Sequence, residues 1–337
     1  KILSFDGKNN KASKFFNSGE QEIIEIKTKQ GYSLKGSYNH PVLCWKHNKL
    51  EWRLLQDAKK GDIVVLNRKP LFAKKDISLK KFYPKNPKFK DITLPRKMNS
   101  DLAFLLGALV SEGSFHQNKI IFNNQDKDFY AHVKNIVLSQ FKGIQLYERK
   151  IKGRCYELEI YHQKAVEFLK NIGLMNVKSE KKVIPFSILQ SSEKIILSFL
   201  RALFEGDGSV SYKTDKRHNG KSIELTYNSK SYELIQQLKI VLLSFGIATT
   251  KPYIDKRSNC YKLTISGIDN IKAFKKIGFF SKRKNTILRK IDYLNSGISK
   301  TDFIPHINDY LRKKYKSEFL IKNNFDRYSN IEKNYKN

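Results

Sequence analysis

An internal repeat constrains the fold of this chain more than any other feature of its sequence. The segment Phe104–Ser114 (FLLGALVSEGS) is echoed by Phe199–Ser209 (FLRALFEGDGS), so that the last acids of the two segments are 95 positions apart. A Cys-Tyr pair and an Ile-Gly pair then recur in the same order, each 105 positions apart, which one ten-residue insertion between 209 and 227 explains. Ordered repeats with one consistent gap predict two similar half-domains.

Each copy of the repeat has the pattern helix, hairpin, helix, hairpin, helix. In the hairpins, Lys, Arg, Tyr and Asn alternate with apolar residues, which is typical of a sheet with one buried face and one basic face. Ser231 is suited to cap a helix, and Gly246 is suited to end it. For the second copy we expect helices at 193–206, 231–245 and 268–277, with hairpins at 209–228 and 249–266.

The segments outside the repeat differ from it in composition. The first of them has short apolar stretches between turn residues, as strands do, and the next is rich in Lys and Pro without a clear period. We therefore expect an α+β protein with five parts: a β-rich region (1–70), a basic linker (71–97), two half-domains (98–178 and 179–295) and a helical and polar tail (296–337).

The charge of the chain points to a polyanionic partner. Its 337 residues include 65 Lys and Arg against 32 Asp and Glu, a formal net charge of +33. A like-charged chain repels itself, and DNA or RNA would relieve that repulsion while releasing counterions. The alternative source of the excess is the Lys-rich composition that an AT-rich genome produces. Nucleic acid remains the partner that this charge favours.

The cysteines and the hydropathy bear on the compartment. Cys44, Cys155 and Cys260 are scattered and odd in number, which argues against a zinc site and a disulfide framework. The longest apolar stretch, 102–110, is too short to span a bilayer, and the start of the chain has no recognisable signal peptide. We expect a cytoplasmic protein that is associated with the nucleoid when it is bound to DNA.

Small residues in each repeated segment favour close packing of two helices. Gly107 and Ser111 are four positions apart in the first copy, as Ala202 and Gly206 are in the second, so each pair shares one helix face. Ordinary core packing would explain one such helix. Two copies of the same small face predict a helix pair about a pseudo-twofold axis.

An acid follows each small face. Glu112 and Asp207 stand at the expected helix ends, followed by Gly113 and Gly208, which suit left-handed C-terminal caps. A carboxylate is unfavourable where the helix dipole is already negative, and pairing of the helices would bring the two acids together. A divalent cation with oxygen ligands would compensate, and paired carboxylates with Mg²⁺ are suited to phosphodiester hydrolysis. The alternative is two solvated acids.

These segments resemble a known family. Residues 105–113 and 200–208 look like the two LAGLIDADG motifs of dodecapeptide homing endonucleases, and the resemblance covers roughly 98–290. Motif one departs from the pattern by having Val110 at the first acidic position and Glu112 at the last. In that family the last acid is the metal ligand, and Glu is accepted there. Arg201 stands where Ala is usual, so we expect it to point away from the helix pair.

The resemblance implies both a fold and an activity. It implies a monomer of two αββαββα half-domains that form a saddle, with the sheets in the major groove of double-stranded DNA. It also implies staggered double-strand cleavage of a long, pseudo-palindromic or asymmetric site. Mg²⁺ would be the cofactor, with Mn²⁺ as a substitute and Ca²⁺ binding without turnover. The metal ligands would be Glu112 and Asp207.

In this family a basic residue from each half stands near the scissile phosphates. Lys182 begins a segment, KVIPF, that resembles the family's Lys-x-Ile-Pro sequence before the second motif. Lys282 is the corresponding candidate after the second repeat, with Lys284 close behind. The alternative for any single lysine is a solvated surface charge.

The DNA contacts are expected in the hairpins, because basic side chains there would face the grooves. Arginine can read guanine edges, whereas most lysines hold phosphates. The candidate contact residues are Arg149, Lys150 and Lys152 in the first copy, and Lys213, Lys216, Arg217, Lys221, Lys256 and Arg257 in the second.

The N-terminal part has a resemblance of its own. The segment 31–43, GYSLKGSYNHPVL, is similar to the Thr-x-x-His block of intein splicing (Hint) domains, with Ser37 in the Thr position and His40 as the histidine. Residue 1 is Lys rather than a nucleophile, and the end of the chain has no His-Asn pair. Two interpretations stay open: an internal fragment of an intein, or a free endonuclease with a partial Hint remnant and a vestigial His40.

Two other functions compete with DNA cleavage. The same scaffold could serve as a catalytically silent nucleic-acid-binding protein, either an RNA maturase or a transcription regulator. The chain could also be the endonuclease-bearing part of a self-splicing intein. Both acids are present, which favours cleavage over the silent scaffold.

Overall fold

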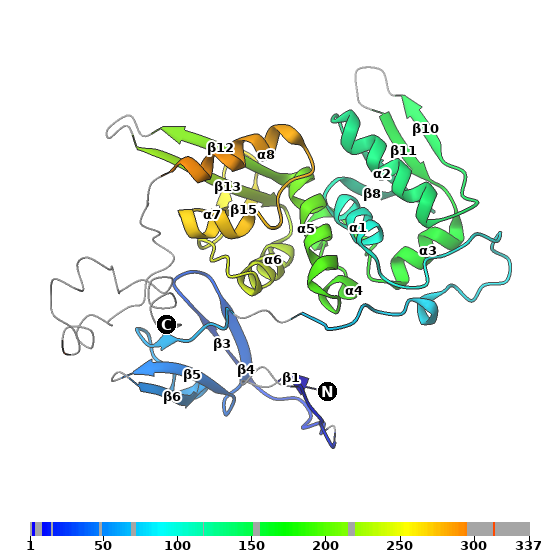
Figure 1. The fold of residues 1–337 in the computed structure, drawn as a ribbon. Helices are drawn as coiled ribbons and strands as arrows, with labels where there is room; N and C mark the ends of the chain where they lie inside the picture. The colour runs from blue at the N-terminus through cyan, green and yellow to red at the C-terminus, as the bar shows by residue number, and fades with distance from the viewer. Residues whose placement is uncertain are drawn as a thin grey trace. The chain divides into compact units, whose positions relative to one another are not determined.

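The computed structural model describes residues 2–3, 9–14, 16–46, 49–68, 72–116, 118–150, 156–214, 220–294 and 313. The chain divides into two units, one containing Lys1–Leu71 and the other Phe72–Thr301 (Figure 1). No helix among the described residues is long and apolar enough to cross a membrane.

The first unit is β-rich, as its sequence predicts. Its antiparallel strands surround a small core formed by Val42, Cys44 and Leu55. The three sheets comprise β1 (Ile2–Leu3) with β2 (Asn9–Asn10), β3 (Ile23–Lys27) with β4 (Ser33–Ser37), and β5 (Pro41–Lys46) between β6 (Lys49–Leu54) and β7 (Ile63–Val64).

The second unit begins with a segment that differs from the expected linker. The start of this segment (72–98) packs on the second half-domain, where the Phe72 ring lies 4.7 Å from that of Phe245, and its later part packs on the first, where the Thr93 N–H donates to the Lys142 carbonyl (3.1 Å). Apolar side chains interspersed among the lysines and prolines make this packing possible. The buried residues of this segment are Leu79, Ile92, Leu94 and Met98. A bridge between Ser78 and Lys97 and a bond from the Tyr83 hydroxyl to the Leu94 carbonyl (2.9 Å) fold the segment on itself. Its composition indicated the charge of this segment but not its packing.

The first half-domain has the predicted αββαββα order. Its four strands form one antiparallel sheet in the order β10-β11-β9-β8. Asn99 caps the first helix by accepting the Leu102 N–H at 2.9 Å. The elements are α1 (Ser100–Glu112), β8 (Gly113–His116), β9 (Lys119–Asn123), α2 (Lys127–Gln140), β10 (Tyr147–Lys150), β11 (Tyr156–Ile160) and α3 (Gln163–Asn171).

The second half-domain repeats this order and the sheet order, β12-β13-β15-β14. Ser231 caps its middle helix, and Gly246, at a φ of 76°, follows the end of that helix, as predicted. The first hairpin is longer than its counterpart, where the sequence locates the insertion. The elements are α4 (Phe186–Leu189), α5 (Glu193–Asp207), β12 (Gly208–Thr214), β13 (Lys221–Ser229), α6 (Tyr232–Ser244), β14 (Tyr253–Asp255), β15 (Cys260–Ile265), α7 (Ile268–Phe274) and α8 (Lys282–Arg289).

Helices α1 and α5 pack side by side between the two half-domains (Figure 1). A Cβ atom at Gly107 would lie 2.3 Å from the Phe199 carbonyl oxygen, and one at Gly206 would lie 2.4 Å from Ser111 Oγ. The predicted small faces therefore meet at the helix pair, where only glycine permits this approach. Arg201 lies outside the pair, where its Nε donates to the Ile277 carbonyl (2.9 Å).

The two halves are also joined by an aromatic side chain. Phe280, from the loop after α7, contacts the rings of Phe104 on α1 and of Phe129 and His132 on α2. Its ring stacks on His132 with the centroids 4.8 Å apart. The second half-domain thus inserts a side chain between two helices of the first, which makes the pair one continuous core.

Candidate active site

The two acids are the last residues of the paired helices. Glu112 ends α1 and Asp207 ends α5. After each acid, the backbone continues directly into the first strand of that half-domain's sheet. The expectation of left-handed caps was wrong, because Gly113 and Gly208 are extended, with φ of −83° and −92°. Glycine is needed there for space, since a Cβ would lie 2.4 Å and 2.5 Å from the carbonyl oxygens of the preceding turns.

A lysine covers the end of each acid-bearing helix. The Lys182 ammonium donates to the carbonyls of Val110 (2.7 Å), Ser111 (3.2 Å) and Gly113 (3.0 Å). A positive charge at this position offsets the negative end of the helix dipole and satisfies carbonyls that the helix leaves unpaired.

Lys284 makes the equivalent contacts in the second half. Its ammonium donates to the carbonyls of Glu205 (2.5 Å) and Gly208 (2.9 Å), and more weakly to that of Phe204 (3.5 Å). The repeat relates these carbonyls to those that Lys182 contacts, because 95 positions separate Val110 from Glu205 and Gly113 from Gly208.

The structure therefore favours Lys284 over Lys282, the residue that the sequence analysis preferred. Ser281 caps α8, and its hydroxyl accepts the Lys284 N–H at 3.5 Å. Residues two positions apart on a helix differ by about 200° in direction. When Lys284 faces the end of α5, Lys282 therefore lies on the opposite side of α8, where it is exposed. Residue order alone does not reveal this helix phase.

Each acid has a polar neighbour that the sequence analysis did not identify. The Asn124 amide donates to Glu112 Oε1 at 2.9 Å, and the Tyr227 hydroxyl donates to Asp207 Oδ2 at 3.3 Å. Tyr227 is fully buried and pairs with Gly208 across the β12–β13 ladder. Correct strand register would have revealed this contact, but a register cannot be read from one hairpin sequence.

Burial makes both acids reluctant to ionise, and Asp207 is also repelled by Glu112. In the metal-free protein, burial first and the nearby Glu112 second raise the pKa of Asp207 to about 7, against the lowering effect of Lys182. Burial also raises the pKa of Glu112, which the Asn124 bond and the two lysines oppose. The site therefore has a deficit of positive charge when both acids are ionised.

The acid pair fits a divalent cation that keeps most of its coordination for water and substrate. Among the described residues no group of three or more His, Cys, Asp and Glu side chains could enclose a metal. Mg²⁺ is usually held by one or two carboxylates together with water and phosphate oxygens. Glu112 and Asp207 supply two carboxylates. Burial raises the pKa of both, and repulsion from Glu112 adds to the rise at Asp207. A bound cation would lower both pKa values.

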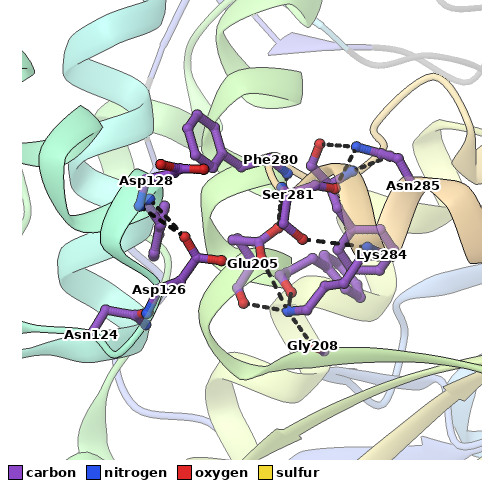
Figure 2. A network of polar contacts seen from close by, with 12 residues as sticks. Asn124, Asp126, Asp128, Glu205, Gly208, Phe280, Ser281, Lys284 and Asn285 are labelled. Atoms are coloured by element: carbon purple, nitrogen blue, oxygen red, sulfur yellow. Dashed lines mark hydrogen bonds and ion pairs between the residues drawn. The ribbon is translucent and has the colours of Figure 1, made fainter.

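A third acid lies beside the second helix end (Figure 2). Glu205 Oε2 accepts the N–H groups of Phe280 (2.9 Å) and Ser281 (3.0 Å), and Oε1 lies 3.4 Å from the Lys284 ammonium. The same two loop residues precede α8, so Glu205 fixes the segment that carries Lys284. Motif one has Val110 at this position.

The predicted DNA contacts divide between the two faces of the sheets. One face of each sheet is covered by helices, and the other face is open. Neighbouring residues of a strand point to opposite faces, so Arg149 and Lys213 lie on the open face. Lys213 forms an ion pair there with Glu224 (2.6 Å). Lys150 lies on the helix-covered face, with its ammonium 5.7 Å from the Tyr156 ring centre. Lys221 shares its face with buried Ile223 and Leu225 at the outer end of β13.

The other predicted contacts lie in turns or outside the described residues. Lys256 and Arg257 occupy the turn between β14 and β15, where the Arg257 N–H donates to Asp255 (3.0 Å). Lys152, Lys216 and Arg217 lie outside the described residues.

His40, the histidine of the Hint-like segment, lies directly before β5. The His40 N–H donates to the Ser37 carbonyl (3.0 Å), and the Ser37 hydroxyl donates to Asn39 Oδ1 (2.7 Å). The His40 side chain is exposed. A role for it in splicing stays a prediction.

Comparison with known proteins finds a family match within the second half-domain. Residues 194–278 match the family of LAGLIDADG-like domains. They include α5 with Glu205 and Asp207, the sheet of the second half and α7. The α+β fold described above is thus LAGLIDADG-like, as the sequence predicts.

The chain is also similar to several curated proteins and solved structures. It is 27% identical to a DNA gyrase protein of Mycolicibacterium flavescens over 98% of this chain, and 31% identical to the replication factor C small subunit of Methanocaldococcus jannaschii over 78%. The chain spans 58% of the length of the first relative and 13% of the second.

Two structures of other proteins resemble parts of the chain. One is the homing endonuclease I-DmoI in complex with DNA and Ca, with a TM-score of 0.39 and 17% identity over 53% of this chain and 88% of that one. The other is full-length DUF199/WhiA from Thermatoga maritima, with a TM-score of 0.37 and 20% identity over 64% of this chain and 66% of that one.

Proposed function

We propose that this protein is a site-specific DNA endonuclease that cuts both strands with a divalent cation held by Glu112 and Asp207. The observation that carries the proposal is the position of these acids at the ends of two closely packed helices, with a lysine at each end. The helix dipole disfavours an acid at such a position, and the two acids also repel each other. A structural role alone does not account for this arrangement.

The residues around the acids have distinct roles in this proposal. A bound divalent cation would supply Lewis-acid stabilisation of the charge that develops on the phosphate. Asn124 and Tyr227 orient the two carboxylates through their hydrogen bonds. Lys182 and Lys284 are already held in position, so they offer positive charge to the phosphates without reorganisation.

DNA binding follows from the charge and from the sheets. The open face of each sheet carries basic side chains such as Arg149 and Lys213, and the whole chain has a formal net charge of +33. Two pseudo-symmetric sheets in one chain suit a long duplex site that a monomer can span. The two halves differ in sequence, which favours an asymmetric target.

Cleavage of a plasmid library that carries randomised sites tests the proposal. We expect linear products in Mg²⁺, with Mn²⁺ as a substitute, and no cleavage in Ca²⁺ or EDTA. The Glu112→Gln and Asp207→Asn variants should bind the selected site and leave it intact. A protein that binds DNA tightly but cuts no library member would instead be a nucleic-acid-binding scaffold, such as an RNA maturase or a transcription regulator.

A second proposal concerns the host of this chain. One segment is shared by relatives with two different names, a DNA gyrase protein and a replication factor C protein, and occupies from 13% to 58% of their lengths. This pattern supports a segment that is inserted into unrelated proteins, as inteins are. Expression with the native flanking sequences and mass spectrometry would detect a ligated host product, and His40→Ala should reduce it. Full-length precursor alone would contradict this proposal.

A further inference from the structure

The two halves of the candidate site differ in charge at the position two residues before the final acid. In the second half, Glu205 places a carboxylate beside the active-site lysine, with only 4% of its side chain exposed. In the first half, Val110 stands at the equivalent position and is also buried. The helices, the final acids and the lysines of the two halves are otherwise arranged alike.

Glu205 holds its lysine through two kinds of contact. Its Oε1 lies 3.4 Å from the ammonium of Lys284, whose side chain is only 11% exposed. Its Oε2 accepts two backbone N–H groups from the loop that leads into α8. The carboxylate therefore fixes the direction of Lys284 and also offsets its charge, at a depth where water screens the pair poorly.

Lys182 is fixed in a different way. Its carbonyl oxygen accepts the Ser231 hydroxyl at 2.6 Å, and the nearby Ile184 N–H donates to Gln237 Oε1 at 2.7 Å. Both partners belong to α6 or its cap. A small pocket lined by Val110, Leu174 and other largely apolar side chains lies beside Lys182. Lys182 thus has the apolar Val110 beside it where Lys284 has the carboxylate of Glu205.

The consequence is a difference in charge between the halves. Both final acids, Asp207 and Glu112, attract Lys182, and Glu112 also attracts Lys284. Glu205 is a further acid beside Lys284, and the repeat places Val110 at its position in the first half. A scissile phosphate near Lys284 therefore meets a less positive environment than one near Lys182, although the lysines make the same backbone contacts.

We propose that Glu205 makes the two strand cleavages unequal, so that the strand served by Lys182 is cut first and a nicked intermediate accumulates. Glu205 is a positioning residue in this scheme, because it acts on the DNA through Lys284. The inference rests on the proposed endonuclease function.

The test follows each strand separately on the selected target, with a different fluorophore on each 5′ end. Lys182→Met and Lys284→Met first identify the strand that each lysine serves, as the strand that each variant slows more. The wild-type protein should then cut the Lys182 strand faster by on the order of tenfold, the size of one unpaired charge acting over a few ångströms. Glu205→Gln, which keeps one acceptor oxygen but loses the charge, should speed the Lys284 strand and bring the two rates together.

A matched variant separates this effect from a general loss of charge. Glu193→Gln removes an acid and its ion pair with Lys276 at the other end of the same helix, and it should leave the ratio of the two rates unchanged. Equal strand rates in the wild-type protein would overturn the inference but keep the endonuclease. The inference would also be overturned if the Glu205→Gln variant bound DNA as tightly as the wild-type protein but left the ratio of the two rates unchanged. A protein that cuts neither strand overturns the proposed function, and the inference with it.

Discussion

Lys182 and Lys284, which are 102 positions apart in the chain, present their ammonium groups to equivalent carbonyls at the ends of α1 and α5. The segments that deliver them differ: Lys182 precedes α4, whereas Lys284 lies within the first turn of α8. The repeat therefore reproduces the site more faithfully than it reproduces the elements around it. Two facing acids require a cation at each helix end, and different segments of the two halves place that cation.

Replacement of either lysine by methionine should reduce cleavage by roughly 100-fold, because each offers a charge that is already oriented toward the developing negative charge. Lys282→Met is the matched control. Lys282 is exposed on the side of α8 away from the acids, so its replacement should change the rate little. Single-turnover rates on the selected target would measure both effects. Equal losses in Lys282→Met and Lys284→Met would contradict the assignment.

The stability of the metal-free protein should depend on Asp207 and on pH. The pKa of Asp207 is about 7 in the folded protein against 3.8 as a reference, so the folded state binds more protons between these values. The stabilising contribution of the protonated acid is therefore fully present below pH 3.8 and is lost as the pH rises through 7. The loss is on the order of 4 kcal/mol at most.

Urea unfolding at pH 8 in EDTA should accordingly show Asp207→Asn to be more stable than the wild-type protein. The difference should shrink toward pH 4, where the wild-type acid is protonated. Adding Mg²⁺ or Ca²⁺ at pH 8 should stabilise the wild-type protein and leave the variant nearly unchanged, because a cation binds the ionised pair. A variant that is less stable than the wild type at pH 8 would contradict a raised pKa of Asp207 in the folded protein.

The close approach of α1 and α5 should make Gly107 intolerant of a side chain. A methyl group there would lie 2.3 Å from the backbone oxygen of Phe199, which cannot move without shifting the helix. Gly107→Ala should reduce the free energy of unfolding by about 2–3 kcal/mol. Gly220→Ala, where a Cβ would meet no atom within 4 Å, is the control and should change it by less than about 0.5 kcal/mol.

Tyr227→Phe should shift the pH dependence of cleavage. The Tyr227 hydroxyl bond to Asp207 lowers the pKa of that acid, so its loss should raise the pKa further. As the pH is lowered from 9, the cleavage rate of the variant should therefore begin to fall at a higher pH than that of the wild-type protein. Tyr212→Phe, a tyrosine on the neighbouring strand with Lys290 over its ring, provides the control. An unchanged profile would mean that Tyr227 serves only the core.

DNA affinity should fall steeply with salt, since each phosphate contact releases counterions. Arg149→Ala should weaken binding and reduce the slope of the salt dependence, because Arg149 lies on the open face of its sheet. Lys150→Ala, one position later on the helix-covered face, should alter both much less. Fluorescence anisotropy between 50 and 300 mM salt, on the order of the physiological range, would measure both slopes. Equal effects would contradict the division of faces.

Patterns in the sequence were sufficient to predict the αββαββα repeat, the helix pair and the position of both acids. These features depend on relations that are local in the chain: small residues at i and i+4, alternation in strands, and a repeat with one gap. Gly107 and Glu112 could be assigned from such patterns without knowledge of any distant contact.

The identity of the side chains that meet the acids came instead from tertiary contacts. Lys284 rather than Lys282 faces the site because the Ser281 cap sets the phase of α8. Tyr227 reaches Asp207 because strand register places it opposite Gly208. Glu205 holds Lys284 through a loop that lies 75 positions later in the chain. Helix phase, register and loop packing depend on the whole core, whose contacts join residues that no local pattern relates.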